Sequence, residues 1–216
     1  MDNANVDDKK ESVVFDDYCI DLLKEVGHIC TGNATVALSQ VIKEKIDLRI
    51  PDLKLVDIDQ IAKTISSSQE VLVGVSIHLL GNMSGNVVLM FPEKSAYSLI
   101  DCISQYPSEL GSATEYGVSS LKEIGNIVIS AYLATLSTFT KTIILFSTPN
   151  LVCGTLDTIF NIAFAKMAGP DNKVLLIDTF FSIPEKNIDG SFFLVFDPVA
   201  VKKIIADSRP SGENGN

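Results

Sequence analysis

The sequence is poor in basic residues. It has 17 Lys and Arg residues against 27 Asp and Glu residues, which gives a formal net charge of −10 at pH 7. Binding to nucleic-acid phosphates requires clustered Lys and Arg side chains. The charge balance therefore argues against a nucleic-acid partner, and equally against an anionic membrane surface.

Histidines, cysteine pairs and long apolar runs are also scarce. The two histidines, His28 and His78, offer no cluster of metal ligands, so no metal is expected to belong to the chain. The four cysteines have no C-x-x-C spacing and no secretory leader is recognisable, which predicts reduced thiols in a cytoplasmic protein. The longest apolar stretch, 127–136, is interrupted by Ser130 and is too short to span a bilayer.

The sequence does contain one polar pattern that occurs twice, [DS]-x3-E-x2-[NH]-x22-P. The first copy consists of Asp21, Glu25, His28 and Pro51, and the second of Ser119, Glu123, Asn126 and Pro149. Every equivalent pair is 98 residues apart, and the flanking Leu-Lys-Glu-Val-Gly corresponds to Leu-Lys-Glu-Ile-Gly. Later in the chain the spacing is 105, between 85–91 and 190–196. We interpret this as an internal duplication with a small insertion between these landmarks.

The apolar spacing predicts an α+β fold in which two equivalent halves share an antiparallel sheet. Each half should contain a long helix that packs on this sheet, and then, after its proline, a short helix, a hairpin of two strands and a final helix. The expected ranges are 16–45, 57–65, 70–80, 85–91 and 93–103 in the first half, and 115–141, 156–167, 173–183, 190–196 and 198–206 in the second.

The small residues of the long helices are expected to let them pack closely around a pseudo-two-fold axis. They are Gly27, Gly32, Gly125, Ser130 and Ala131. Composition further predicts loose tails at 1–11 and 208–216, around a single domain over 12–207 made of repeats at about 12–106 and 107–207.

The polar residues of the repeat lie on one face of each predicted helix, because they are spaced by three and four positions. A carboxylate and an amide on a helix lack an activated nucleophile and do not make an active site alone. They can complete the active site of another protein, because an amide can both donate to and accept from a water and so direct it at a phosphorus atom. A single such pair would be an ordinary solvated face, but its recurrence with the same proline spacing favours a function.

The pattern resembles the CheC family of chemotaxis phosphatases, over about residues 14–206. Two signatures are typical of CheC and of the middle domain of FliY, and the resemblance is closer to CheC because the chain ends shortly after the second repeat. The resemblance implies hydrolysis of the aspartyl phosphate of a CheY-type response regulator, with Mg²⁺ supplied by that partner and no cofactor of the chain's own.

By this resemblance Glu123 and Asn126 are the catalytic residues of the second site, and Glu25 and His28 occupy the first. Ser119 and Asp21 would support them. The family has Asn where this chain has His28, which puts the first site in doubt, since water placement tolerates little error. The alternative is therefore a non-catalytic adaptor that binds CheY or CheD.

The resemblance also implies that the helix after the second proline contributes to binding the receptor deamidase CheD. Asp157 is the residue expected to do so, although Leu156, Ile159, Phe160 and Ala163 on the same helix are typical of an ordinary core stripe.

Overall fold

The computed structural model describes residues 17–49, 52–61, 65, 69–81, 83–103, 115–164, 167, 173–197 and 201. The first half contains α1 (Asp17–Ile42), β1 (Asp47–Leu48), β2 (Asp52–Asp57), the short 3₁₀ helix η1 (Ile58–Gln60), β3 (Leu72–Leu80), β4 (Gly85–Pro92) and α3 (Glu93–Ile103). The second half contains α4 (Glu115–Thr140), β5 (Leu145–Phe146), β6 (Asn150–Gly154), α5 (Leu156–Phe164), β7 (Lys173–Ile183), the 3₁₀ helix η2 (Pro184–Lys186) and β8 (Ile188–Phe196).

The described strands form one eight-stranded sheet in which every pairing is antiparallel. Its main path runs β1-β7-β8-β4-β3-β5, and β2 also pairs with β7 while β6 pairs with β3. The strand that follows each long helix thus pairs with the hairpin of the other half. This exchange joins the two repeats in one sheet, and the shared sheet was predicted from the sequence. The pairings of β2 with β7 and of β6 with β3 were not predicted.

A pseudo-two-fold axis passes through the centre of the sheet. Val88 of β4 lies opposite Phe193 of β8, its own equivalent 105 residues later. In the outer pairs, Leu53 lies opposite Ile177 and Leu151 lies opposite Val75. Since Leu151 follows Leu53 by 98 residues, Ile177 is the equivalent of Val75 at a spacing of 102. The drift from 98 to 105 therefore arises in two steps, before β7 and between β7 and β8.

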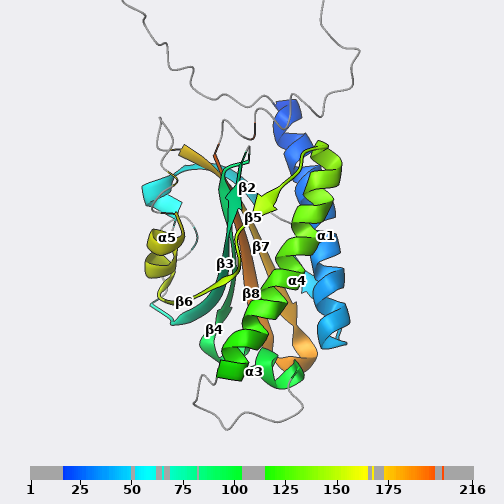
Figure 1. Cartoon of the computed structure of the whole chain (residues 1–216), viewed down its shortest axis with the longest axis vertical. Helices are drawn as coiled ribbons and strands as arrows, with labels where there is room; N and C mark the ends of the chain where they lie inside the picture. Colours follow the sequence, from blue (N-terminus) through cyan, green and yellow to red (C-terminus); the bar gives the residue numbers. More distant parts are fainter. Residues whose placement is uncertain are drawn as a thin grey trace, which may run out of the picture.

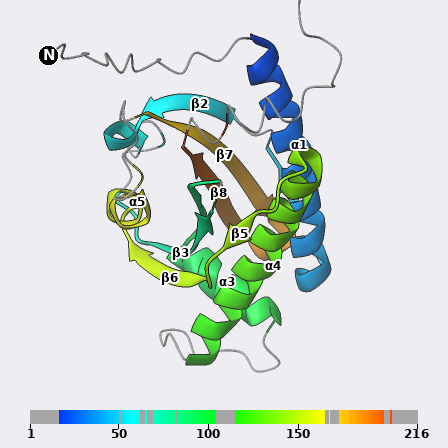
Figure 2. The ribbon, with the colours of Figure 1, turned by 45° about the horizontal axis from the view of Figure 1, so that its top comes forward.

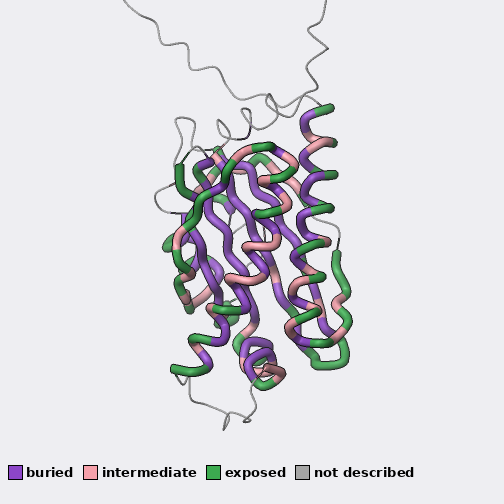
Figure 3. The backbone as a smooth tube through the Cα atoms, turned by 45° about the vertical axis from the view of Figure 1, so that its right-hand side comes forward, coloured by how far each residue is buried: buried purple, intermediate pink, exposed green. Residues whose placement is uncertain are grey.

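Helices cover both faces of the curved sheet, so two hydrophobic cores share it (Figures 1 and 2). The larger core lies under α1, α3 and α4, and the smaller one lies on the concave side under α5. Alternate residues of each central strand contribute to opposite cores, as the pleat requires. The central strands are consequently almost wholly buried, whereas the long helices alternate between buried and exposed residues (Figure 3).

The two long helices lie side by side and run in opposite directions (Figure 1). The Nδ2 of Asn33 donates a hydrogen bond to the Oγ1 of Thr135 at 2.9 Å, from one helix to the other. The expected role of the small residues is wrong for Gly125, because a Cβ there would meet Val75 of the sheet at 2.5 Å. It is also wrong for Gly32, where a Cβ would meet nothing within 4 Å.

Most of the predicted elements are confirmed within a few residues, and α3 and β7 have the predicted bounds. The prediction that each proline is followed first by a helix is wrong, because β2 and β6 come before the helical segments. Most of the predicted helix 198–206, the tails and Pro51 lie outside the described residues, as do residues 62–64 of the predicted helix 57–65.

Candidate functional site

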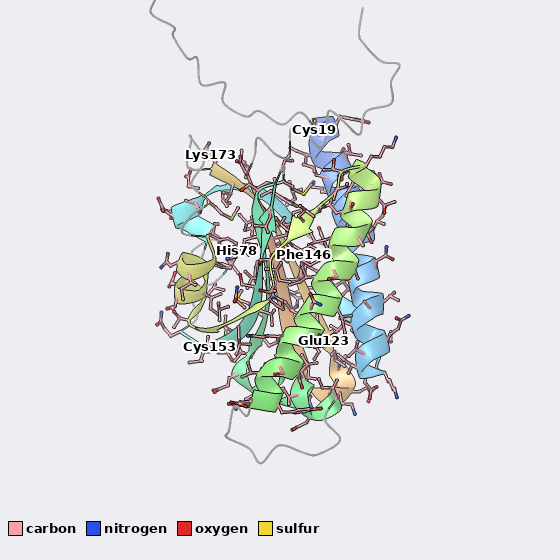
Figure 4. All side chains as sticks on the ribbon, in the orientation of Figure 1. Cys19, His78, Glu123, Phe146, Cys153 and Lys173 are labelled. Atoms are coloured by element: carbon pink, nitrogen blue, oxygen red, sulfur yellow. The ribbon has the colours of Figure 1, made fainter. Side chains whose placement is uncertain are left out.

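The second copy of the polar pattern forms a row on the outer surface of α4. Ser119 and Glu123 are exposed and Asn126 is half-buried, whereas Leu121, Ile124 and Gly125 face the sheet and are buried. Figure 4 shows Glu123 on the N-terminal part of this helix. The predicted arrangement, polar side chains projecting together from one face of a rigid helix, is confirmed.

The hydroxyl of Ser119 is used within the helix itself. Its Oγ donates a hydrogen bond to the carbonyl oxygen of Glu115 at 2.8 Å. A serine bonded to the carbonyl four residues earlier is held against its own helix. The hydroxyl is therefore engaged within α4, one turn before Glu123, and the supporting role of Ser119 stays a prediction.

The first copy of the pattern lies on α1 in the same way. Asp21, Glu25 and His28 are all exposed, and the intervening Leu23 and Val26 are buried. His28 is more exposed than its equivalent Asn126, which is half-buried. The imidazole thus stands further out from the surface than the amide of the second site.

The two sites are far apart. The hydrogen bond between Asn33 and Thr135 marks a point where the antiparallel helices lie level with each other. Glu25 lies eight residues from this level toward one end of the pair, and Glu123 lies twelve residues from it toward the other. At 1.5 Å per residue the two carboxylates are separated by about 30 Å along the helix axes. The two pairs are therefore too far apart to form a single site.

A cluster of three charged side chains on β2 and β7 lies beside the first site. The Nζ of Lys54 lies 2.8 Å from Oδ2 of Asp52 and 3.6 Å from Oδ2 of Asp178. The hydrogen bond from Lys54 lowers the pKa of Asp52, to which the charge of Lys24 on α1 also contributes. Burial raises the pKa of Asp178, and the nearby Lys54 opposes that rise.

A large cavity lies on the concave side of the sheet, away from both sites. It has a volume of about 520 Å³ and is lined mainly by β1, β7 and β8 together with Leu72, Met90 and Leu156. No residue of either polar pattern lines it. At the equivalent place in the other half, Asn86 donates from Nδ2 to the carbonyl oxygen of Ala163 and so anchors α5. The cavity has the shorter Ser191 in place of Asn86.

Within the ranges that the structure describes, no group of three or more His, Cys, Asp and Glu side chains could hold a metal ion. None of the helices in those ranges is long and apolar enough to cross a membrane.

Helix α5 carries the predicted core stripe, since Leu156, Ile159 and Phe160 are buried. Asp157 lies on its exposed side together with Thr158, Asn161 and Ile162, and 59% of Ile162 is exposed. Asp157 is therefore accessible, and it lies on the opposite side of the sheet from the two polar rows.

One further pair of residues near the sites is repeated and was not predicted from the sequence. Tyr18 and Tyr116 are also 98 residues apart, and each precedes its glutamate by seven positions. Their exposed fractions are 56% and 58%. The spacing was visible in the sequence, but only the structure shows that both rings face solvent.

Comparison with known proteins gives consistent results. The model of the CheC-like family matches residues 118–153, which include Ser119, Glu123, Asn126 and Pro149. The CheY-P phosphatase CheC of Bacillus subtilis is 22% identical over 191 residues, which cover 86% of this chain and 91% of that protein.

Solved structures with the same fold include FliY of Thermotoga maritima. It has a TM-score of 0.67 at 20% identity and covers 90% of this chain and 98% of its own. CheX, in its complex with CheY, BeF₃ and Mg²⁺ from Borrelia burgdorferi, has a TM-score of 0.55 at 16% identity, covering 80% and 99%. The chain is thus similar to the CheC-like family over the residues of the second polar pattern, and it shares its fold with FliY and CheX.

Proposed function

We propose that the protein is a phosphatase that hydrolyses the aspartyl phosphate of a CheY-type receiver protein in chemotaxis signalling. The B. subtilis relative is named a CheY-P phosphatase, and the CheX structure is a complex with CheY. At 22% identity these names support the reaction class, and the assignment of residues rests on the geometry of this chain.

The observation that carries the proposal is the position of Glu123 and Asn126. They project from the outer face of a helix whose other face is packed on the sheet, and neither lines the large cavity. A carboxylate and an amide on an open surface cannot enclose a small substrate. They can enter the active-site pocket of a partner that already holds the phosphoryl group.

The proposed chemistry needs no group covalently attached to this chain. The amide of Asn126 donates to and accepts from one water and orients it in line with the phosphorus atom. The water oxygen bonds to phosphorus while the bond from phosphorus to the aspartate oxygen breaks, which releases inorganic phosphate and the free carboxylate. Glu123 pairs with a lysine of the receiver and fixes the helix there. The receiver supplies the Mg²⁺ that neutralises the phosphoryl oxygens.

The experiment follows loss of the phosphoryl group from phosphorylated receiver proteins. Removing a group that positions or stabilises the transition state commonly lowers the rate by on the order of 10²–10³, so Asn126→Ala should do so. Thr138→Ala, at an exposed position near the other end of α4, is the matched control and should match the parent. An Asn126→Ala protein as fast as the parent would refute the residue assignment, and a parent inactive on every receiver would refute the function.

The alternative function is that of an adaptor that binds CheY or CheD without hydrolysis. The presence of His28 in place of the family's Asn in the first site favours this alternative.

We propose that α5 contributes to CheD binding through its exposed side, with Asp157 as a contact. Asp157→Lys should weaken CheD binding measured by calorimetry and leave dephosphorylation unchanged. Unaltered binding would remove α5 from the proposed interface.

A further inference from the structure

Comparing equivalent exposed positions of α1 and α4 shows which surface residues are the same in both repeats. Five equivalent positions are exposed in both helices. They are the pairs 18 and 116, 21 and 119, 25 and 123, 36 and 134, and 40 and 138. Only two of these five pairs are identical in the two repeats: the glutamates Glu25 and Glu123, and the tyrosines Tyr18 and Tyr116.

The tyrosines lie on the same helix face as the polar rows. Seven residues make almost two complete turns, so Tyr116 lies nearly in line with Glu123, about 10 Å toward the N-terminus of α4. The order along this face is Tyr116, Ser119, Glu123 and Asn126, at spacings of three, four and three. Tyr18 has the same relation to Asp21, Glu25 and His28 on α1. The aromatic ring therefore continues the row of the site by one helical turn.

Helix propensity does not favour an aromatic residue at these exposed positions. More than half of each ring is exposed, at 56% for Tyr18 and 58% for Tyr116. Tyrosine is also a poorer helix former than alanine, lysine or glutamate, which suit exposed positions. The other exposed pairs have diverged, to Val36 and Ala134 in one case. Retaining the same large and mostly exposed ring at both sites makes it a candidate contact for a partner.

We propose that Tyr116 and Tyr18 are docking contacts for the receiver protein at the second and first sites. This inference rests on the proposed function. Tyrosine is enriched among residues that dominate binding energy, because its ring buries a large apolar area and its hydroxyl still finds a hydrogen bond. When the glutamate and its neighbour enter the receiver's pocket, a ring about 10 Å further along the same helix face lies against the rim of that pocket. The tyrosine holds the receiver in place and takes no part in the chemical step.

The test separates binding from chemistry. Tyr116→Ala should raise KM for the phosphorylated receiver by about tenfold and leave kcat within about twofold, as expected for the loss of a contact worth more than 1 kcal/mol to binding alone. Tyr116→Phe should retain most of the affinity, because the ring remains. Thr138→Ala, exposed on the same helix, should leave both parameters unchanged. An unchanged KM in Tyr116→Ala, or a fall in kcat alone, would overturn the proposal.

A second measurement uses binding without turnover. The receiver treated with beryllofluoride, which mimics the phosphoryl group, is titrated into the parent, into Tyr116→Ala and into the double variant with Tyr18→Ala. Affinity should fall with the first substitution and again with the second, while the unfolding temperature stays the same. A parent that binds but does not hydrolyse would refute the proposed function and leave the docking role measurable. A double variant that binds like the parent would refute the docking role.

Discussion

Gly125 of α4 lies directly against Val75 of β3, so closely that a Cβ on the glycine would come within 2.5 Å of the valine Cγ1. In the other half Gly27 faces Ile177, the equivalent of Val75, at 4.0 Å. The two glycines are thus equivalent in sequence, but only Gly125 lies where a side chain would clash with the sheet. Each belongs to the helix of one repeat and faces a strand of the other.

We expect Gly125→Ala to lower the free energy of unfolding, and Gly27→Ala to raise it slightly. At Gly125 the extra methyl group meets a buried β-branched side chain, and overpacking of this kind typically costs about 1–3 kcal/mol. At Gly27 the methyl group fits, and alanine favours the helix by up to about 1 kcal/mol. Denaturant unfolding of both variants checks this, and equal effects would contradict it.

Thr179→Val should stabilise the protein. Thr179 is 1% exposed, and its hydroxyl has no hydrogen-bond partner within the described part of the chain. Its equivalent in the other repeat is the fully buried Ile77. Burying an unpaired hydroxyl costs about 1–3 kcal/mol in proteins, so the free energy of unfolding should rise by about 1 kcal/mol. The converse change, Ile77→Thr, should lower it, and a destabilised Thr179→Val protein would contradict the expectation.

Stability should fall as the pH rises through the titration of Asp178. Burial raises the pKa of this carboxyl above the ordinary 3.8, so the folded protein holds the proton more tightly than the unfolded chain. Between 3.8 and the raised value, the folded state therefore loses stability with increasing pH. Across this range, the free energy of unfolding of Asp178→Asn should increase relative to that of the parent as the pH rises.

Lys54→Met provides the control for this pH dependence. Lys54 opposes the rise in the pKa of Asp178, so its removal should extend the decline in stability to higher pH. A difference between Asp178→Asn and the parent that did not change with pH would show that burial of the carboxyl has no such effect.

His28→Asn should create a working first site and raise turnover. The gain should persist in an Asn126→Ala background, because the two sites lie about 30 Å apart along the helix pair and effects at separated sites normally add. A first site that stays inactive in the His28→Asn variant would show that it has diverged beyond this residue.

The repeat made most of the fold predictable. Because the same apolar spacing occurs twice, α3 and β7 could be given their correct bounds, and the hairpins of β3 with β4 and β7 with β8 followed from the turns between them. The exposed face with Glu123 and Asn126 also followed from helical spacing. These features depend on neighbours in the sequence, which is why the sequence reveals them.

The features that were not predicted are contacts between residues far apart in the sequence. Strand β2 is short and follows Pro51, and nothing in Leu53, Lys54 and Leu55 indicates that they pair with 175–177 of the other repeat. The same holds for the close approach of Gly125 to Val75, which the sequence analysis assigned to contact between the helices. Local patterns predict elements, whereas these contacts join residues about 50 or more positions apart.

The exchange of β2 and β6 between the halves has a consequence for synthesis on the ribosome. When β2 leaves the exit tunnel, its partner β7 lies about 120 residues further along the chain. At about 5–20 residues per second, translation needs roughly 6–24 s to deliver it. For that time the first repeat presents an unpaired strand edge and the uncovered inner face of α1, which are the surfaces on which nascent chains aggregate. The second repeat meets no such delay, because β6 finds β3 already made.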